Sequence, residues 1–514
     1  MTVTEELQEP LLEIETSPSQ EERMDVIERI ESPKMTKSCY ISIALAVFPM
    51  FHYGYHIGVL NAPVAYMFPE KTMGQWAIAV SIFCLGGVLG ASVAGGLADA
   101  YGRSRMLWLL GGGVGLLASL VSAMAPTVHW FWVARTLVGV SGGAATVLTP
   151  LYLSEAAVVR PESKGTLGTL TQLATVLGIL VSAMIGIPLS HDWRWLFWIM
   201  VVMNGCMIAL VPCSLPESPQ WLLLHRYVER GQEAKRILDR WYSFSSTNVT
   251  AGTDAGDELL NNEQINQCIQ RHIMNGSEEV AVRNTTENEN EEEPTSSFAS
   301  YYQSHRIPVL SVFVYVMTQQ LSGVNAVFYY STSFLQGVID DAQTITLLCF
   351  AVNAVSVLPP VYYMDRFGRK TWLLTSLTGM AVCAAGLTVG RVASISSVTI
   401  LSLFGYIISF ELGLGCIPFF LASDLIQAEY IAQIQSWAMA LNWISNFGIG
   451  IGFPYLDHVL GEYSFAPFLG VLVVALLYTI WILPEISTTT HNTAAVVEDE
   501  EAMGLSSNGN GTMT

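Results

Sequence analysis

Apolar residues gather in long runs along this chain, and polar residues stand between the runs. A run of about 20 mostly apolar residues is long enough to cross a bilayer as a helix. The pattern therefore predicts twelve membrane-spanning helices in an all-α membrane protein. They lie near residues 40–62, 75–98, 106–126, 129–151, 166–188, 193–214, 306–336, 342–363, 372–391, 397–423, 432–456 and 465–483.

Three short polar motifs occur twice, in the same order, at the ends of corresponding spans in the two halves of the chain. The pairs are Asp99-Ala100-Tyr101-Gly102-Arg103 with Asp365-Arg366-Phe367-Gly368-Arg369, Ser154-Glu155 with Ser423-Asp424, and Leu215-Pro216-Glu217 with Leu483-Pro484-Glu485. Three ordered coincidences indicate a duplicated six-span unit, which is how many secondary transporters are built.

Composition and charge agree with a membrane protein. Hydrophobic residues make up 51% of the chain and charged residues 13%, about half the charge of an ordinary soluble protein. The placement of Lys and Arg between spans predicts that both termini are cytosolic. The net charge of -20 comes from two tails and a central loop that we expect to be disordered, and the acidic start of the chain has no apolar core of a cleavable signal.

These segments define five regions. They are a disordered acidic tail (1–37), a first six-helix bundle (38–215), cytosolic helices followed by an acidic loop (216–305), a second six-helix bundle (306–484) and a disordered tail (485–514). The eight cysteines have no metal-site or disulfide spacing, so we expect no metal and no cofactor. No catalytic motif indicates an enzyme, and so acidic a chain carries no nucleic-acid footprint.

Charged residues at the inner ends of the spans are candidates for an inner charge latch. Pairs formed across the midline in one state and broken in the other would close the cytosolic side while the outer side is open. Solvated charges at helix ends are the alternative interpretation. The latch residues are Arg103, Glu155, Glu217, Arg369, Asp424 and Glu485.

Polar side chains also lie deep within several spans, where they are costly unless they are paired or wetted. Amides both donate and accept hydrogen bonds, which suits a neutral polyhydroxylated ligand, although single amides often only hold helices together. Phe419, Phe420 and Trp443 could stack on the apolar face of a sugar ring. The polar set is Gln172, Gln319, Gln320, Asn325, Asn353, Glu411 and Asn442.

Two further features concern motion. Gly413, Gly415 and Pro418 lie together in the tenth span, where they weaken the helical hydrogen-bond ladder and mark either a hinge or an ordinary kink. Tyr329 and Tyr330 lie one turn outward from the polar part of the seventh span, as an outer gate.

The chain resembles the sugar porters of the major facilitator superfamily, which include the animal facilitative hexose transporters. The seventh-span run is the most specific sign, whereas a lone Asp-x-x-Gly-Arg marks only the superfamily. The resemblance rests on Gln319 through Tyr330 (QQLSGVNAVFYY), Pro216-Glu217-Ser218-Pro219, Asp365 through Lys370, Gly165 through Gln172, and Asn442-Trp443.

The resemblance implies two six-helix bundles around a central cavity, a short cytosolic helical bundle, and alternating access. It implies that the polar set above contacts a monosaccharide such as glucose or fructose. Some family signatures are missing: Ala100 and Gln220 stand where Arg is usual, and Phe419 stands where many hexose carriers have Trp. An Arg expected near Ile431 is also absent. The run between Glu155 and Gly165 is about two residues longer than is usual in the family, which leaves Arg160 or Lys164 as the basic partner.

Three functions remain open at this point. Proton-coupled members of the family carry Asp in the first span at the place of His56, so facilitative uniport is favoured, with His56 as a candidate proton-coupling residue because histidine titrates near neutral pH. A proton-coupled sugar symporter is the second possible function, and a sugar sensor that binds without transport is the third. We expect an integral multi-pass protein of the plasma membrane, with the vacuolar membrane as the alternative; oligomeric state is not predicted.

Overall fold

The computed structural model describes residues 34–243, 298–326 and 342–483. Within these ranges, helices stand at all twelve places where the sequence predicts a span. The first half contains α2 (Lys37–Gly58), α3 (Met73–Tyr101), α4 (Arg103–Met106), α5 (Gly115–Met124), α6 (Val128–Ala156), α7 (Lys164–Gly186) and α8 (Arg194–Ser214). The second half contains α13 (Arg306–Leu321), α15 (Ala342–Ser356), α16 (Leu358–Tyr363), α17 (Arg369–Val392), α18 (Ser396–Leu412), α19 (Ile417–Leu425), α20 (Ile431–Leu460) and α21 (Ala466–Trp481).

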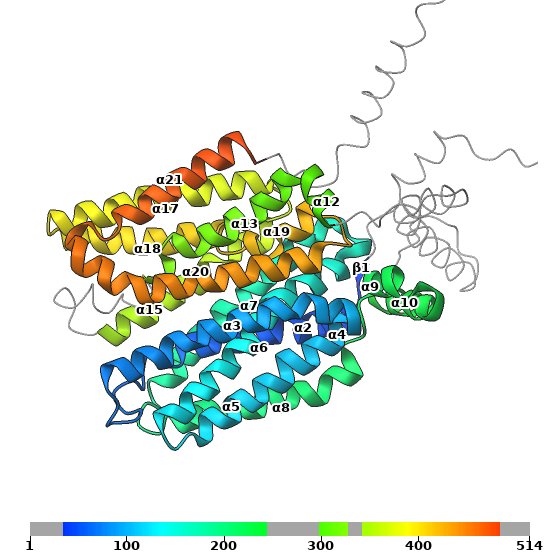
Figure 1. The fold of residues 1–514 in the computed structure, drawn as a ribbon, viewed down its shortest axis with the longest axis horizontal. Coiled ribbons are helices and arrows are strands. Elements are labelled where there is room, and N and C mark those ends of the chain that lie inside the picture. Colours follow the sequence, from blue (N-terminus) through cyan, green and yellow to red (C-terminus); the bar gives the residue numbers. More distant parts are fainter. Residues whose placement is uncertain (1–33, 244–297, 327–341, 484–514) are drawn as a thin grey trace, which may run out of the picture.

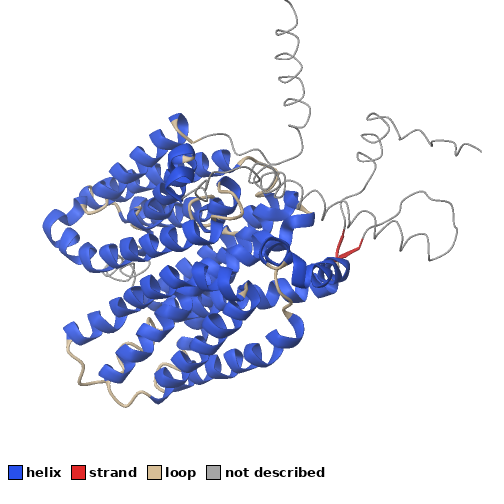
Figure 2. Ribbon diagram, turned by 45° about the vertical axis from the view of Figure 1, so that its right-hand side comes forward, coloured by secondary structure: helices blue, strands red, loops and turns tan. Residues whose placement is uncertain are grey.

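The two halves of the chain form two separate helical bundles that lie side by side (Figure 1). The first bundle, blue to green, occupies the lower part of the view, and the second, green to red, the upper part. Figure 2 shows that the described residues are almost entirely helical. The predicted fold class, an all-α membrane protein of two bundles, is confirmed.

Length and hydropathy support membrane crossing for most of these helices. Among the described residues, nine helices are long and apolar enough to span a bilayer, and α20 with α21 meet the same test together across a bend of 95°. The first predicted span, α2, is 22 residues long and does not meet that test. Several of its polar and aromatic side chains, among them His52, Tyr55 and His56, are buried inside the bundle.

Two helices are interrupted where the sequence places glycine. The third span passes from α4 through a π-helical turn, Leu107–Val114, before it continues as α5, and this turn contains Gly111-Gly112-Gly113. The tenth span ends as α18 at Leu412 and restarts as α19 at Ile417, with Pro418 in the first turn of the new helix. Proline is tolerated at that position because the N–H it lacks has no helical partner there. The predicted break is confirmed.

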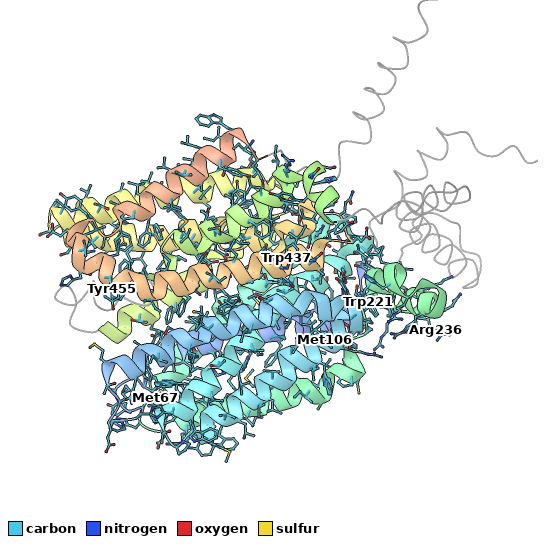
Figure 3. The ribbon with its side chains drawn as sticks, viewed as in Figure 1. Met67, Met106, Trp221, Arg236, Trp437 and Tyr455 are labelled. Atoms are coloured by element: carbon cyan, nitrogen blue, oxygen red, sulfur yellow. The ribbon has the colours of Figure 1, made fainter. Side chains whose placement is uncertain are left out.

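The inner end of the molecule is the end that carries the short helices α9 (Pro219–His225) and α10 (Tyr227–Trp241), where Figure 3 labels Trp221 and Arg236. Short helices are thus present where the sequence predicts them after the sixth span, and their cytosolic side stays a prediction. α12 (Phe298–Ser304) leads into the second bundle. Three 3-10 turns, Ala157–Val159, Pro161–Ser163 and Gly461–Tyr463, join longer helices.

A small antiparallel ribbon ties the start of the first bundle to α10. Strand β1 (Lys34–Met35) pairs with β2 (Tyr242–Ser243). The hydroxyl of Thr36 donates to the carbonyl oxygen of Arg240 (2.7 Å) and accepts from the N–H of Cys39, which caps α2. The expectation that residues 1–37 are wholly disordered is therefore wrong for residues 34–37, because both chain segments supply backbone partners to each other.

Helices of the two halves meet along three lines. α3 packs beside α20, α7 beside α15 and α16, and α19 beside α6 and α7. The pairing of α3 with α20 is visible at the centre of Figure 1, where blue and orange helices run together. These lines of contact bring residues of both halves to the middle of the molecule.

Candidate functional site

Five amide side chains of the second half form one hydrogen-bonded cluster on α13, the segment after it and α20. Asn442 donates to the side-chain oxygen of Gln319 (2.8 Å), and Gln320 donates to that of Asn442 (3.1 Å). Asn325 donates to the oxygens of Gln320 (2.5 Å) and Asn446 (3.0 Å). The predicted placement of Gln319, Gln320 and Asn325 on one side of the seventh span fits this cluster, and Asn446 joins it as a residue that was not among the predicted site residues.

Gln319 also joins the cluster to the break in the tenth span. Its amide nitrogen donates to the carbonyl oxygens of Leu414 (3.0 Å) and Gly415 (3.1 Å). A helix that stops leaves carbonyl groups without an intrahelical partner, and in a membrane such groups must be satisfied by other protein atoms. Gln319 therefore stabilises the break as well as lining the cluster.

A second polar contact joins the two halves directly. Gln172 of α7 donates from its amide nitrogen to both carboxyl oxygens of Glu411 in α18, at 2.9 and 3.1 Å. Both side chains are buried. A carboxyl group and an amide at this depth can hydrogen-bond hydroxyl groups as donors and acceptors.

Asn353 and Phe419, two further members of the predicted set, are also buried in the second half. Asn353 of α15 is buried, and its side-chain oxygen has no hydrogen-bond partner. Such an oxygen is costly without a partner, so it is suited to accept from a ligand or from water. Phe419 lies at the start of α19, and its backbone oxygen accepts from Gln435 (2.8 Å).

Trp443 has a different environment from the one the sequence suggested. Its ring belongs to α20 of the second half but lies against the first half, close to Gly87 of α3. Its indole N–H donates to the hydroxyl of Thr146 in α6 (3.3 Å). Trp443 is 1% exposed, so neither face of its ring is open for a sugar to stack on in this structure.

The inner charged residues of the first half form a cluster in which they contact partners of the same half. Arg103 contacts the carboxylates of Glu155 (2.9 Å) and Asp99 (2.8 Å). One oxygen of Glu217 accepts the backbone N–H groups of Arg103 (2.7 Å), Ser104 (2.9 Å) and Ser218 (3.0 Å). Burial raises the pKa of the Glu217 carboxyl, although these three donors oppose that shift.

The inner charges of the second half form the matching cluster. Arg369 contacts Asp424 and Asp365, each at 3.0 Å. We expected latch pairs across the midline, but Arg103–Glu155 and Arg369–Asp424 each lie within one half. The helix that carries each arginine begins next to the helix that carries its acid, so the nearest partner is inside the bundle.

At the inner end, the charged residues that do contact the opposite half are Asp365 and Lys164. The carboxylate of Asp365 accepts the backbone N–H groups of Gly165 (2.8 Å) and Thr166 (2.6 Å) at the start of α7, where the helix dipole favours a negative charge. Lys164 lies 3.5 Å from Asp424 and also donates to the carbonyl oxygen of Ser423. Of the two basic candidates, Lys164 takes this position, and Arg160 pairs with Glu162 (3.0 Å).

His56 lies inside the first bundle. Arg135 donates to its backbone oxygen (2.9 Å), the ring of His52 is 4.6 Å away, and neither ring nitrogen of His56 has a hydrogen-bond partner. Three predicted residues, the gate tyrosines Tyr329 and Tyr330 and the latch residue Glu485, lie outside the described residues.

Several residues that contact the site or the opposite half could not be identified from the sequence, for a common reason. Asp365 and Asn446 stood in recognised motifs but were given no role, Gly87 indicated only a close helix contact, and Thr146 carried no signal of its own. Their importance comes from what lies opposite them in space, which a single sequence does not display.

Comparison with known proteins now adds the family. The sequence model described as "Sugar (and other) transporter" matches residues 42–497. Facilitated glucose transporter member 4 of solute carrier family 2 from Homo sapiens is 30% identical over 513 residues, which cover 91% of this chain and 93% of the relative. Member 3 from Canis lupus familiaris is 29% identical over 482 residues, covering 88% and 90%.

Solved structures show the same fold. The proton:xylose symporter XylE bound to 6-bromo-6-deoxy-D-glucose matches with a TM-score of 0.71 at 18% identity, covering 91% of this chain and 100% of that one. The inward open conformation of XylE from E. coli matches with a TM-score of 0.61 at 19% identity, covering 90% and 98%.

The fold defines a membrane carrier of the major facilitator type. This chain belongs to the sugar porter family of that superfamily. It is an integral multi-pass membrane protein and a sugar transporter, and its family consists of transporters rather than enzymes.

Proposed function

We propose that this protein carries a neutral hexose, such as glucose or fructose, by facilitative uniport with alternating access. The observation that supports the proposal most directly is the meeting of hydrogen-bonding side chains from both halves, none of which is cationic. Gln172 and Glu411 join the halves at 2.9 Å, and the amides Gln319, Gln320 and Asn442 lie in the same half as Glu411. Relatives named as facilitated glucose transporters agree with this substrate class.

A sugar fits such a site because its hydroxyl groups can replace the hydrogen bonds that the amides now make to one another. Each hydroxyl both donates and accepts, as each amide does. Exchanging one set of bonds for another keeps the net cost of binding small. None of the seven polar residues proposed here to contact the sugar is cationic, which argues against an anionic substrate.

Uniport is supported by the surroundings of His56. Proton coupling needs a group that takes up and releases a proton during the cycle. A proton on His56 would place a second positive charge beside Arg135, whose guanidinium donates to the His56 backbone oxygen. The alternatives are a proton-coupled sugar symporter that uses His56 and a sensor that binds sugar without moving it.

The experiment is counterflow of labelled glucose, and then fructose, in liposomes that contain this protein alone, with and without an imposed pH gradient. Accumulation without a gradient is the expected result. Accumulation that requires an inward proton gradient, and that His56→Asn abolishes, would replace uniport by symport. Sugar binding without flux would favour the sensor.

The site assignment has its own test. Gln319→Ala should weaken sugar binding by roughly 1–3 kcal/mol, because it removes a buried hydrogen-bonding group. Because Gln319 also holds the broken tenth span, Gln320→Ala serves as a second variant that leaves those carbonyl contacts in place. Unchanged affinity in both variants would remove the assignment.

We place the protein in the plasma membrane with both termini cytosolic, which antibody access to tagged termini in intact and permeabilised cells would check.

A further inference from the structure

Trp443 crosses from one half of the molecule into the other near the middle of two long helices. It belongs to α20, and the space it fills is formed by Tyr53, Phe83, Gly87 and Thr146 of the first half. We call this space the Gly87 socket. Residue 87 is near the midpoint of α3, and residue 443 is near that of α20.

The ring occupies the place that a side chain on residue 87 would take. A Cβ atom added to Gly87 would lie 2.2 Å from Cδ2 and 2.3 Å from Cε3 of the Trp443 ring. Atoms that close must move apart, and the ring has little room to move. Tyr53 and Phe83 pack on it with ring centroids 5.3 and 5.1 Å away.

The socket is built on two helices whose backbones touch. A Cβ atom on Gly143 of α6 would lie 2.1 Å from the backbone oxygen of Gly87, and one on Gly139 would lie 2.1 Å from that of Phe83. Small residues allow this close approach between membrane helices. α3 and α6 therefore cannot easily separate to make room for a displaced ring.

The polar end of the ring is fixed as well. The hydroxyl of Thr146 donates to the carbonyl oxygen of Gly143 (2.7 Å), so its oxygen is left free to accept the indole N–H of Trp443 (3.3 Å). Indole is a donor only. The indole N–H and the Thr146 hydroxyl oxygen thus match as donor and acceptor across the midline.

Contacts at the inner end differ in kind. There the halves are joined by Asp365 and Lys164 through charged groups, which water can solvate when the halves separate. Withdrawing Trp443 would instead expose a large apolar ring and leave a cavity, and both are unfavourable.

We propose that Trp443 is an interlock: its ring stays in the Gly87 socket and keeps the halves in register while their ends open and close. The residue is a positioning residue for transport rather than a surface on which sugar stacks. This inference rests on the proposed carrier function.

The first test is Gly87→Ala, with Gly96→Ala as its matched control on the same helix, because a Cβ atom on Gly96 meets nothing within 4 Å. Overpacking of this kind should slow sugar exchange by about tenfold, while equilibrium sugar affinity stays within about twofold. Equal exchange rates in the two variants would overturn the interlock, as would a loss of affinity that accounts for the whole effect.

The second test is rescue. Trp443→Phe shortens the ring and opens space, so Gly87→Ala combined with Trp443→Phe should exchange sugar faster than Gly87→Ala alone. Independent sites give additive effects, whereas residues in contact do not. Additive effects of the two substitutions would refute the pairing, and a large loss of affinity in Trp443→Phe alone would return this residue to the sugar site.

Failure of the carrier function can be told apart from failure of the interlock. If the unmodified protein moves none of the sugars, the carrier function fails. Amide hydrogen exchange along residues 436–448 of α20 then tests whether Trp443 and Gly87 are in contact. Gly87→Ala should raise the exchange rate, and the double variant should lower it again. Unchanged exchange would overturn the interlock itself.

Discussion

The two inner charge clusters derive from the same duplicated motifs, yet they act on different partners. In the first half, Arg103 forms ion pairs with Asp99 and Glu155, and the Glu217 carboxylate accepts the backbone N–H of Arg103. In the second half, Arg369 pairs with Asp424, but Asp365 also reaches the start of α7 in the other bundle. A repeated sequence motif thus stabilises one bundle and joins both bundles.

The cytosolic helices account for part of this difference. Trp221 of α9 donates to the backbone oxygen of Asp99 (3.1 Å), and its ring lies 6.0 Å from the Arg103 guanidinium carbon. His225 stacks on the same tryptophan (5.7 Å). In the second cluster the ring over the Arg369 guanidinium carbon is that of Phe420 in α19 (5.4 Å), and Asp365 and Asp424 contact residues of α7. We therefore expect the first cluster to set stability and the second to set the balance between conformers.

The largest expected effect is on stability. Arg103→Ala leaves the buried carboxylate of Glu155 without its cation and should lower the free energy of unfolding by about 3–5 kcal/mol. Arg369→Ala is the matched variant of the other half. Hydrogen exchange at the start of α7 should rise in Arg369→Ala and stay unchanged in Arg103→Ala. If exchange there rose in Arg103→Ala and not in Arg369→Ala, the roles assigned to the two clusters would be wrong.

Asp365→Asn addresses the contact between the halves. It removes the charge that faces the N–H groups of Gly165 and Thr166 and should weaken that contact by about 1–3 kcal/mol. Exchange of these two amides with deuterium should therefore accelerate. Asp99→Asn, at the equivalent place in the first half, is the control and should leave them protected. Protection in both variants would show that Asp365 does not hold the inner end.

Lys164→Met should have a smaller effect. Lys164 is partly exposed, and partly exposed ion pairs contribute about 0–1 kcal/mol. We expect a modest rise in labelling of the cavity from the cytosolic side in reconstituted vesicles. Arg160→Met is the control, because Arg160 pairs with Glu162 of the same half. It should leave labelling unchanged. If both variants behave alike, the Lys164–Asp424 pair does not join the halves.

The smallest expected effect concerns pH. The folded protein holds the pKa of Glu217 above its ordinary value, chiefly through burial. Folded protein therefore binds the proton more tightly than unfolded protein, and this stabilisation is lost as pH rises from the ordinary carboxyl pKa through the raised one. Glu217→Gln can keep the accepting oxygen, so its Tm should fall less with rising pH, by on the order of a degree or two. Parallel pH profiles would contradict this.

Local features of the molecule were predictable from the sequence. Long apolar runs gave the helices, Gly413 and Pro418 gave the break in the tenth span, and Ser218-Pro219 marks the start of α9, where the Ser218 hydroxyl accepts the N–H of Trp221 (3.2 Å). Helix formation and termination depend on neighbours within a few residues. The polar side chains of the candidate site were also identifiable, because amides are rare deep in a membrane span.

Partners across the molecule were decided by the tertiary structure. Trp443 and Thr146 are 297 positions apart, and Lys164 and Ser423 are 259 apart. Which side chains meet depends on the rotation and depth of each helix against its neighbours, and one sequence does not encode these as a visible pattern. The sequence determined that this protein is a duplicated twelve-span membrane protein with a polar centre. The tertiary structure decided that the arginine pairs stay within each half, and that a tryptophan and an aspartate join the halves.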